Sequence, residues 1–474
     1  MLRVAFALAL TLASSHLCGQ TESKRLPVPT ASALAEATKL VAEVYRKDYT
    51  DAKTPAQKQA LAKKLLADGE ATTDDSTARY SLIELARKIA GSLGDVDLAF
   101  KAIDAQAKKF EIDVLAAKLQ VVSDLASSVK DPGRCYDLLC VIHDLMDEAL
   151  AAQGSEQVRE LQALLMKVGA RIADPILRKQ VEGRNAEVDE ILARMPKYKA
   201  AEAVLASQPA DAAANHDVGT YWLLLGKWEK ALPFLALSSE AALQKLAELE
   251  LQGGSPANEA QALVEGWWEL AKSAQGWRKA QYQSRALQHI KARWTAYSPL
   301  TRTKFTRYIQ DFLEENKHSI VRWQAYRLEY ATPAPWHVRL NAPRGQSLQG
   351  SISPISDHEG MLDITLVART DSTNIRVDAY GKAMVIFNWE VRPEELRVHR
   401  PDGSMAGHKF TPLQVGRFYT LRWIYEPTAM RVLVNGAIVC RERWQDQLPP
   451  NRVRVYTMES TVDVRSLSVV PVMK

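Results

Sequence analysis

The sequence is poor in cysteine and has none of the spacings that build a disulfide framework or a common zinc site. Only four of its 474 residues are cysteine. Cys135 and Cys140 stand five positions apart in a segment of helical periodicity, so a bridge between them would distort the helix. No CxxC or HxxxH spacing occurs, although structural zinc sites commonly use such spacings. We therefore expect no disulfide scaffold, no bound metal and no cofactor.

Long apolar runs and blocks of one charge are also missing. Beyond the first 19 residues, no apolar run approaches the roughly 18 residues that a membrane-spanning helix needs. The formal net charge of +5 at pH 7 is small for this length, and no Lys/Arg block is present. Such blocks are typical of segments that bind nucleic acid. We predict neither a transmembrane segment nor a nucleic-acid partner, and the length predicts two or three domains.

The first 19 residues have the order of a Sec signal peptide. An arginine precedes the apolar run Val4–Leu12, which is too short to span a bilayer, and a polar stretch follows. Cleavage after this segment would leave Gln20 as the first mature residue. A lipoprotein would instead begin at Cys18, but the residue before it is Leu17 rather than a small residue. We predict export to an extracytoplasmic location, periplasmic or secreted, without a lipid anchor.

The chain changes character once, near residues 331–350. Before this segment Ala, Leu, Lys, Glu and Gln dominate and apolar residues recur with a helical period. After it Val, Ile, Thr, Arg and Tyr dominate and the period is two. The segment itself contains the breakers expected at a boundary. We predict an α-helical repeat domain and an all-β sandwich that fold independently, with the bounds signal peptide 1–19, linker 20–31, helical-repeat domain 32–330, linker 331–350 and β-sandwich 351–474.

The helical half consists of short amphipathic segments joined by small-residue turns. Ser32–Tyr49 carries apolar residues at i, i+3 and i+4 spacing, which predicts one helix with a buried stripe. Thr54-Pro55 is a candidate N-cap followed by proline at the first helical position. Gly219–Leu237 resembles a tetratricopeptide repeat, a two-helix unit with a small residue at the turn. The resemblance implies an α-solenoid that presents a surface for protein interaction.

This half also resembles a module of secreted bacterial proteins of undefined function. The segments that carry the resemblance are Leu40–Tyr45, Ala78–Tyr80 with Gly94-Asp95, Trp228–Ala236 and Gly266–Ala271. In its relatives the module precedes various C-terminal domains, including lectin-like sandwiches. The resemblance implies a fold and an export route rather than a reaction.

Tryptophan is concentrated in one stretch, because eight of the eleven lie from Trp222 to Trp336 inclusive. An aromatic cluster can stack sugars or peptides. Large rings more often fill the space between helices, and packing is our interpretation. His143, His216 and His289 stand alone, with no second ligand one helical turn away, so we expect no metal at them.

The β half alternates between apolar and polar residues along each strand. Leu362, Ile364 and Leu366 are expected to face inward, with Asp363 and Thr365 on the opposite face. The same alternation recurs around Ile375 to Ala379 and around Tyr419 to Tyr425. Asn435-Gly436 predicts a type I′ hairpin, in which both central residues have positive φ.

One stretch of the β half, Gly416–Trp444, resembles the late strands of a concanavalin A-like, or laminin G-like, jelly-roll sandwich. The resemblance rests mainly on the hairpin Val434-Asn435-Gly436. Domains of this class bind carbohydrate, bind proteins or form the body of glycosidases. The fold alone therefore does not decide the function.

Catalytic residues are not evident in the β half. Glycosidases on this fold carry Glu-x-Asp-x-Glu along one strand, and no such motif occurs here. A cross-strand pair of acids, such as Asp363 with Asp378, is the alternative left open. Asp357, His358 and Glu359 could join Asp363 in a calcium loop, but the adjacent glycine suits an ordinary turn. We predict no catalytic residue and no metal ligand.

Polar residues near the strand ends are the candidate ligand contacts. A sugar or peptide could dock at Asn388, Trp389 and His399, while Arg376 and Arg422 could hold carboxylates through bidentate contacts. The alternative is that all five are ordinary edge and turn residues. We take Asn388, Trp389, Arg376, Arg422 and His399 as the predicted binding residues.

Together these features favour a non-catalytic extracytoplasmic binding or scaffold protein. Its helical repeats would interact with proteins, and its sandwich would bind glycan or protein. The alternatives are a carbohydrate-active enzyme with a dispersed site and a purely structural envelope protein. A binding protein predicts aromatic and polar side chains on one exposed face, whereas an enzyme predicts converging acids or histidines with shifted pKa values.

Overall fold

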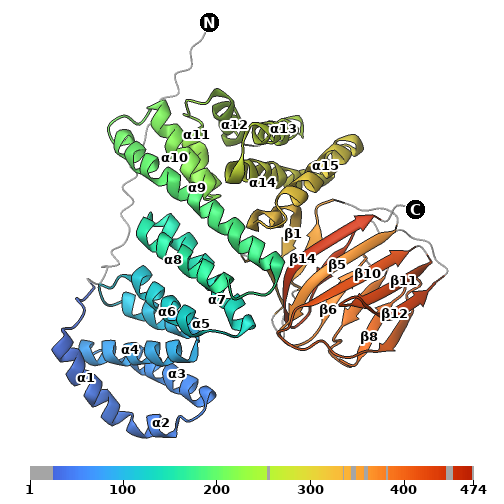
Figure 1. The fold of residues 1–474 in the computed structure, drawn as a ribbon. Helices are drawn as coiled ribbons and strands as arrows, with labels where there is room; N and C mark the ends of the chain where they lie inside the picture. The colour runs from blue at the N-terminus through green and yellow to red at the C-terminus, as the bar shows by residue number, and fades with distance from the viewer. Residues whose placement is uncertain are drawn as a thin grey trace. The chain divides into compact units, whose positions relative to one another are not determined.

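The computed structural model describes residues 25–253, 257–334, 336–342, 349–356, 361–379, 383–426, 428–444 and 452–471. The chain divides into two compact units, with the boundary between Asp124 and Leu125. Figure 1 shows the helices of the chain followed by its strands. The predicted signal peptide, with Cys18, and the calcium alternative at Asp357–Glu359 lie outside the described residues. No described helix is both long and apolar enough to cross a membrane.

The first unit is helical, and its caps follow from the sequence. Its helices are α1 (Ala31–Val44), α2 (Arg46–Asp51), α3 (Pro55–Ala71), α4 (Ser76–Leu93), α5 (Val96–Ala107) and the start of α6 (Val114–Ser128). Thr54 and Gln57 form the capping box of α3. The single helix expected over residues 32–49 is interrupted at Tyr45, whose hydroxyl donates to Asp68 Oδ2 at 2.7 Å.

The helices of the second unit run from α7 to the 3₁₀ segment η2. They are α7 (Pro132–Ala151), α8 (Ser155–Gly169), α9 (Pro175–Leu205), α10 (Ala212–Leu224), α11 (Trp228–Leu235), α12 (Ala241–Leu251), α13 (Ala257–Ser273), α14 (Gly276–Arg293), η1 (Trp294–Ala296), α15 (Pro299–Glu315) and η2 (Ile320–Ala325). Asp131, Asp174 and Ser298 each cap a helix that begins with proline.

Seven of the eight tryptophans from Trp222 to Trp336 are buried, which confirms their packing role.

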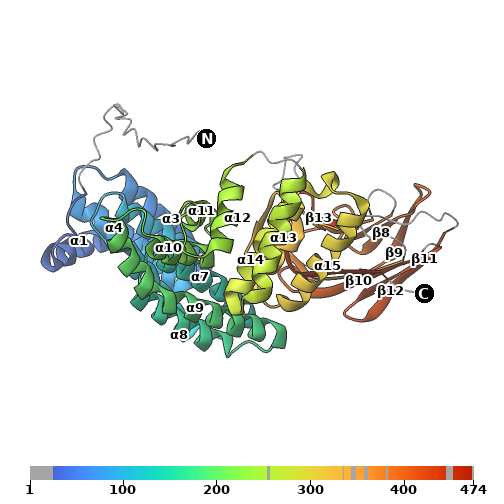
Figure 2. The ribbon, with the colours of Figure 1, turned by 90° about the horizontal axis from the view of Figure 1, so that it is seen from above.

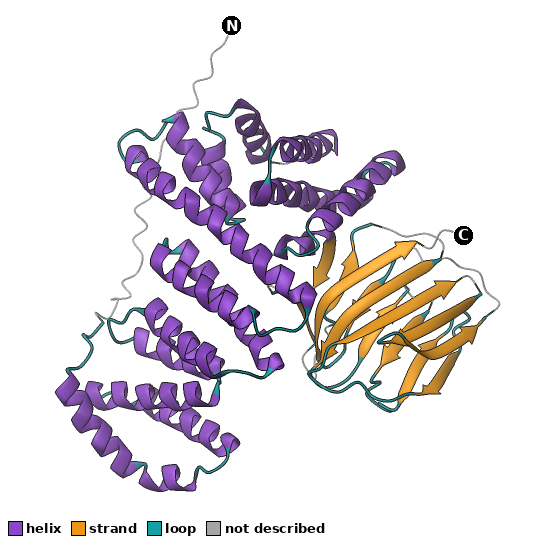
Figure 3. Cartoon of the chain, in the orientation of Figure 1, coloured by secondary structure: helices purple, strands orange, loops and turns teal. Residues whose placement is uncertain are grey.

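A β-sandwich follows the helices, as the sequence predicts (Figure 3). Within the described residues the first antiparallel sheet has the order β1-β4-β13-β6-β7-β8-β9 and the second β12-β11-β10-β5-β14-β3-β2. Figure 2 views the sandwich from a second direction. The strands are β1 (Tyr326–Glu329), β2 (Ala331–Pro333), β3 (Val338–Asn341), β4 (Ser351–Pro354), β5 (Leu362–Thr370), β6 (Ile375–Asp378), β7 (Met384–Phe387), β8 (Glu395–His399), β9 (Met405–Lys409), β10 (Tyr419–Glu426), β11 (Ala429–Val434), β12 (Ala437–Arg443), β13 (Arg454–Tyr456) and β14 (Thr461–Pro471).

The inner faces of the sheets follow the alternation in the sequence. Leu362, Ile364 and Leu366 are buried, and the intervening residues of β5 are more exposed. Asn435 and Gly436 connect β11 to β12 with φ values of 48° and 85°, which confirms the predicted turn.

The strands begin earlier than expected, because β1 follows η2 directly and β2 and β3 lie within residues 331–350. The prolines and glycines of that segment predicted a linker, so the two short strands were not expected there.

A buried polar interface joins α7 and α9 to the sandwich within the second unit. The Tyr136 hydroxyl and His337 Nδ1 lie 2.8 Å apart, and Arg465 pairs with Asp174 at 2.6 Å. Arg322, which is 5% exposed, donates to the carbonyl oxygen of Trp336 at 3.1 Å. Burial lowers the pKa of Arg322 to about 10. Independent folding of the two halves stays a prediction. A test of it has to measure how much these contacts between the helices and the sandwich stabilise each half.

Candidate ligand-binding face

The outer face of the first sheet collects charged and aromatic side chains in two rows. Along β6, Ile375 and Val377 face the core, so Arg376 and Asp378 face outward. The strand register aligns each of these two residues with partners on neighbouring strands. One row is Tyr456, Arg376, Ile386 and Arg397, and the other is Arg454, Asp378, Met384 and His399.

Arg376 is fixed at the centre of this face. Its Nε donates to Asn374 Oδ1 at 3.1 Å, and its guanidinium forms an ion pair with Glu390. The guanidinium also lies 5.8 Å from the centre of the Tyr456 ring. With 8% exposure, Arg376 is far more buried than an outward strand residue on a solvated sheet. Its position is therefore set by specific contacts.

Two more arginines lie against aromatic rings on the same face. The Arg454 guanidinium is 4.3 Å from the centre of the Tyr456 ring, and Arg397 is 4.7 Å from that of Trp389. Arg454 Nη2 donates to Asp378 at 3.3 Å, and Arg397 Nη1 donates to Glu395 at 3.2 Å. The Nε atoms of both arginines are buried and have no hydrogen-bond partner among the described residues. These Nε atoms are covered by the protein, so a ligand on this face can reach only the partly exposed ends of the Arg397 and Arg454 side chains.

The surroundings of His399 lower its pKa and so favour the neutral imidazole. Burial lowers its pKa, and the positive charges of Arg397 and Arg376 lower it further, while Asp378 acts in the opposite direction. A neutral imidazole offers one donor and one acceptor. His399 can therefore exchange hydrogen bonds with a hydroxyl group in both directions.

The structure brings three of the five predicted binding residues together. Arg376, Trp389 and His399 belong to the outer face of the first sheet, as the register and the Arg397–Trp389 contact show. Asn388 has a structural role, since its amide bonds both the backbone N–H and the carbonyl of Leu413 at 2.7 and 2.8 Å.

Arg422 lies elsewhere and does not join this group. It is on β10 of the second sheet and pairs with Asp363.

The sequence reasoning missed Arg397, Arg454 and Tyr456. The alternation of β8 would have placed Arg397 beside His399. The alternation of Val453, Val455 and Thr457, which predicts a strand, would likewise have placed Arg454 and Tyr456 on its other face.

Several acids of the sandwich, including Asp363, Glu442 and Asp463, are held by basic partners. Asp363 lies on β5 in the second sheet and Asp378 on β6 in the first, so these two are not a cross-strand pair. Burial tends to raise the pKa of Glu442, but hydrogen bonds from Arg400 and His408 lower it overall. The pKa of Asp463 is likewise lowered, because hydrogen bonds and charge from Arg339 outweigh its burial. A general acid requires the opposite shift.

Comparisons with known proteins add limited information. No protein-family model matches the sequence, and no curated protein is significantly similar to it. Among solved structures, the chain is similar to the exoplasmic/lumenal domain of VIP36 in its Ca²⁺/Man3GlcNAc-bound form, at 11% identity and a TM-score of 0.28, over 32% of this chain and 84% of that one. It is similar to the carbohydrate-binding module CBM66 from Bacillus subtilis at 9% identity and a TM-score of 0.24, over 31% and 94%.

A third similarity is to a sialidase, at 9% identity and a TM-score of 0.27. It covers 32% of this chain but only 17% of the sialidase. Similarities of this size do not establish a shared function. The contacts on the outer face of the first sheet have to support any functional conclusion.

Proposed function

We propose that the protein is an extracytoplasmic, non-catalytic binding protein whose sandwich binds glycan at the outer face of the first sheet. The supporting observation is that Arg376, Arg397 and Arg454 lie against Tyr456 and Trp389 on one face. Aromatic rings pack against the apolar faces of sugar rings, and fixed guanidinium groups donate to hydroxyl or carboxylate oxygens. The helical repeats serve protein interaction, and the sandwich belongs to the concanavalin A-like class.

The charge balance of the face favours recognition by hydrogen bonds over net attraction. Three arginines face three carboxylates, those of Glu390, Glu395 and Asp378. Each carboxylate is paired with one of the arginines, so the face has little net charge. The arginines remain oriented, and the side chains of Arg397 and Arg454 stay partly exposed. Neutral and acidic glycans both fit this pattern.

Glycan-array binding of the full chain tests the proposal with a matched pair of variants. Arg397→Met removes a guanidinium from the face, and we expect glycan affinity to fall about tenfold, since hydrogen bonds from charged groups contribute about 1.5–3 kcal/mol. Arg422→Met removes a comparably ion-paired arginine from the other sheet and should leave affinity unchanged. Equal affinities for the two variants, or no glycan bound by the wild type, would refute the proposal.

The absence of hydrolysis needs a separate test. The wild type is incubated with a panel of polysaccharides, and reducing ends are measured. We expect none to be released. Release by the wild type that is abolished in Asp363→Ala or Asp378→Ala would show an enzyme instead.

Export is tested at the N-terminus of the exported protein. We expect sequencing to find a chain that begins near Gln20. A chain that still begins at Met1 would contradict export by a cleaved signal peptide, and an acylated Cys18 would show a lipoprotein.

A further inference from the structure

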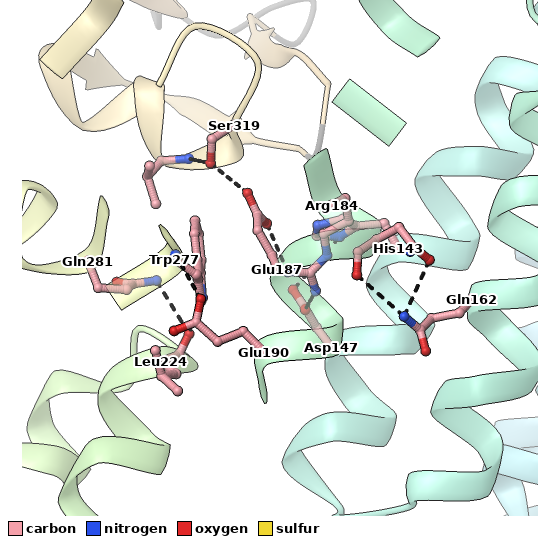
Figure 4. Close-up of polar contacts among 12 residues, drawn as sticks. His143, Asp147, Gln162, Arg184, Glu187, Glu190, Leu224, Trp277, Gln281 and Ser319 are labelled. Carbon is pink, nitrogen blue, oxygen red and sulfur yellow. Dashed lines mark hydrogen bonds and ion pairs between the residues drawn. The ribbon is translucent and has the colours of Figure 1, made fainter. Parts of the chain in front are cut away.

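A cavity lies in the second unit between its helices and the strands β1 and β2, and it shares no lining residue with the two rows on the outer face of the first sheet. Its volume is about 270 Å³, and α7, α9, α14 and η2 contribute its walls. Figure 4 shows His143 and Asp147 beside Arg184, which in turn contacts Glu187. An engineered cavity of roughly 150 Å³ accommodates benzene. The space is therefore sufficient for a substituted six-membered ring.

Several polar atoms at this cavity lack a protein partner. His143 is 2% exposed, yet neither ring nitrogen has a hydrogen bond among the described residues. Its Nδ1 lies 3.5 Å from Asp144 Oδ1 and 3.8 Å from Asp147 Oδ2, too far for good hydrogen bonds. Arg184 Nε and Trp323 Nε1 are also buried without partners in the described structure. Buried polar groups are normally satisfied, so these atoms mark the cavity as a place for a polar occupant.

The cavity also contains a cation that has no carboxylate of its own. Lys291 Nζ donates only to neutral oxygens, Gln324 Oε1 at 3.3 Å and the carbonyl of Tyr326 at 3.4 Å. No ion pair of Lys291 exists within the described part of the chain. Burial lowers its pKa, and the charge of Arg327 adds to the shift. An anionic ligand group at Lys291 would relieve both effects.

One face of α14 forms a continuous wall of the cavity. The residues that line it from this helix are Trp277, Gln281, Ser284, Gln288 and Lys291. Their spacing of three or four positions places them along one side of a helix. Trp277 is held in place because its Nε1 donates to the carbonyl of Leu224 at 2.7 Å. The wall combines a fixed indole, amides, a hydroxyl and an ammonium group.

We propose that this cavity binds a small monocarboxylate that carries several hydroxyl groups, the class of the hexuronic acids. The carboxylate pairs with Lys291, and the hydroxyl groups bond to His143, Arg184 Nε and Trp323 Nε1. Donors outnumber acceptors among the unpartnered groups, which matches a ligand rich in oxygen acceptors. The indole rings of Trp228 and Trp277 provide apolar surface for the ring carbons. This site is distinct from the glycan-binding face and does not depend on it.

Isothermal titration of the full chain with D-glucuronate tests this site, and D-glucose measures the contribution of the carboxylate. We expect glucuronate to bind at least tenfold more tightly than glucose. Lys291→Met should weaken glucuronate binding by about 10- to 100-fold, the range for a lost bond to a charged group. The matched control is Lys279→Met on the same helix, where Lys279 pairs with Glu315 outside the cavity lining. The control should bind as the wild type does.

A second variant keeps the test decisive if Lys291→Met fails to fold. Trp323→Phe retains the ring but removes the unpartnered N–H, and we expect it to weaken glucuronate binding severalfold. Arg397→Met, on the glycan-binding face, should leave glucuronate binding intact, so failure of one site can be told from failure of the other. The proposal is overturned if only water occupies the cavity and glucuronate gives no heat at roughly 10 mM, or if Lys291→Met and Lys279→Met bind equally.

Discussion

Acidification should destabilise the second unit through His337. This residue is 3% exposed and shares a 2.8 Å hydrogen bond with the Tyr136 hydroxyl. Its pKa is lowered from 6.5 to about 4, mainly by burial. The charged groups that face it are Asp463, Asp137, Arg339 and Arg369, of which the two acids raise the pKa and the two arginines lower it. The folded state therefore holds this histidine neutral.

The sign and size of the effect follow from linkage. Because the folded pKa lies below the unfolded one, the unfolded chain takes up the proton first as the pH falls. The contribution of His337 to stability is complete above its unfolded pKa of 6.5 and is lost as the pH falls to about 4. Between about pH 7 and about pH 5 this one residue should cost about 2 kcal/mol.

Urea unfolding followed by tryptophan fluorescence measures this cost in the wild type and in His337→Gln. The glutamine can still bond to Tyr136 but does not titrate. The wild type should lose about 2 kcal/mol more than the variant over this pH interval. Parallel stability curves for the two proteins, or an NMR titration that gives His337 a pKa near 6.5, would refute the reasoning.

Three further outcomes are expected. Asp463→Asn leaves two guanidinium groups facing each other without their shared carboxylate. It should lower the free energy of unfolding by about 3 kcal/mol in chemical denaturation, whereas Asp402→Asn, at an exposed position, should lower it little. Equal losses in the two variants would contradict this reasoning. Gly436→Ala should lower stability by about 1 kcal/mol, because Gly436 has a φ of 85°. Gly91→Ala should not lower it, because the new methyl group meets open space in α4. Thermal melts compare the two variants. The sandwich fragment 326–474 should fold alone but melt at a lower temperature than the fragment 129–474, because it lacks Tyr136 and Asp174. Equal melting temperatures would show that these contacts add no stability.

Local patterns made much of the fold predictable. The alternation of Leu362, Ile364 and Leu366 and the turn at Asn435-Gly436 encode their structure within a few residues. The capping box at Thr54 is equally local. The alternation of Val453 and Val455 also predicts the strand β13. Its place between β4 and β6 was not predictable, since that place depends on pairing with strands far away in the sequence.

The candidate sites were less predictable because they depend on long-range contacts. Arg376 looked like a solvated outward residue, and only the approach of Tyr456 and Glu390 makes it a buried one. His143 was interpreted as an isolated helical histidine, which is correct along the sequence. The cavity at His143 forms where α9, α14 and η2 pack around it, and no local spacing in the sequence predicts that packing.

The places of β13 and β14 bear on when the sandwich can form during synthesis. Both strands come late in the chain, yet β13 lies between β4 and β6, and β14 lies between β5 and β3. Neither sheet can therefore close until these residues have left the ribosome, and every earlier nascent chain lacks an interior strand in each sheet. A stop codon before β13 would leave two split sheets with exposed strand edges, which are sites of aggregation.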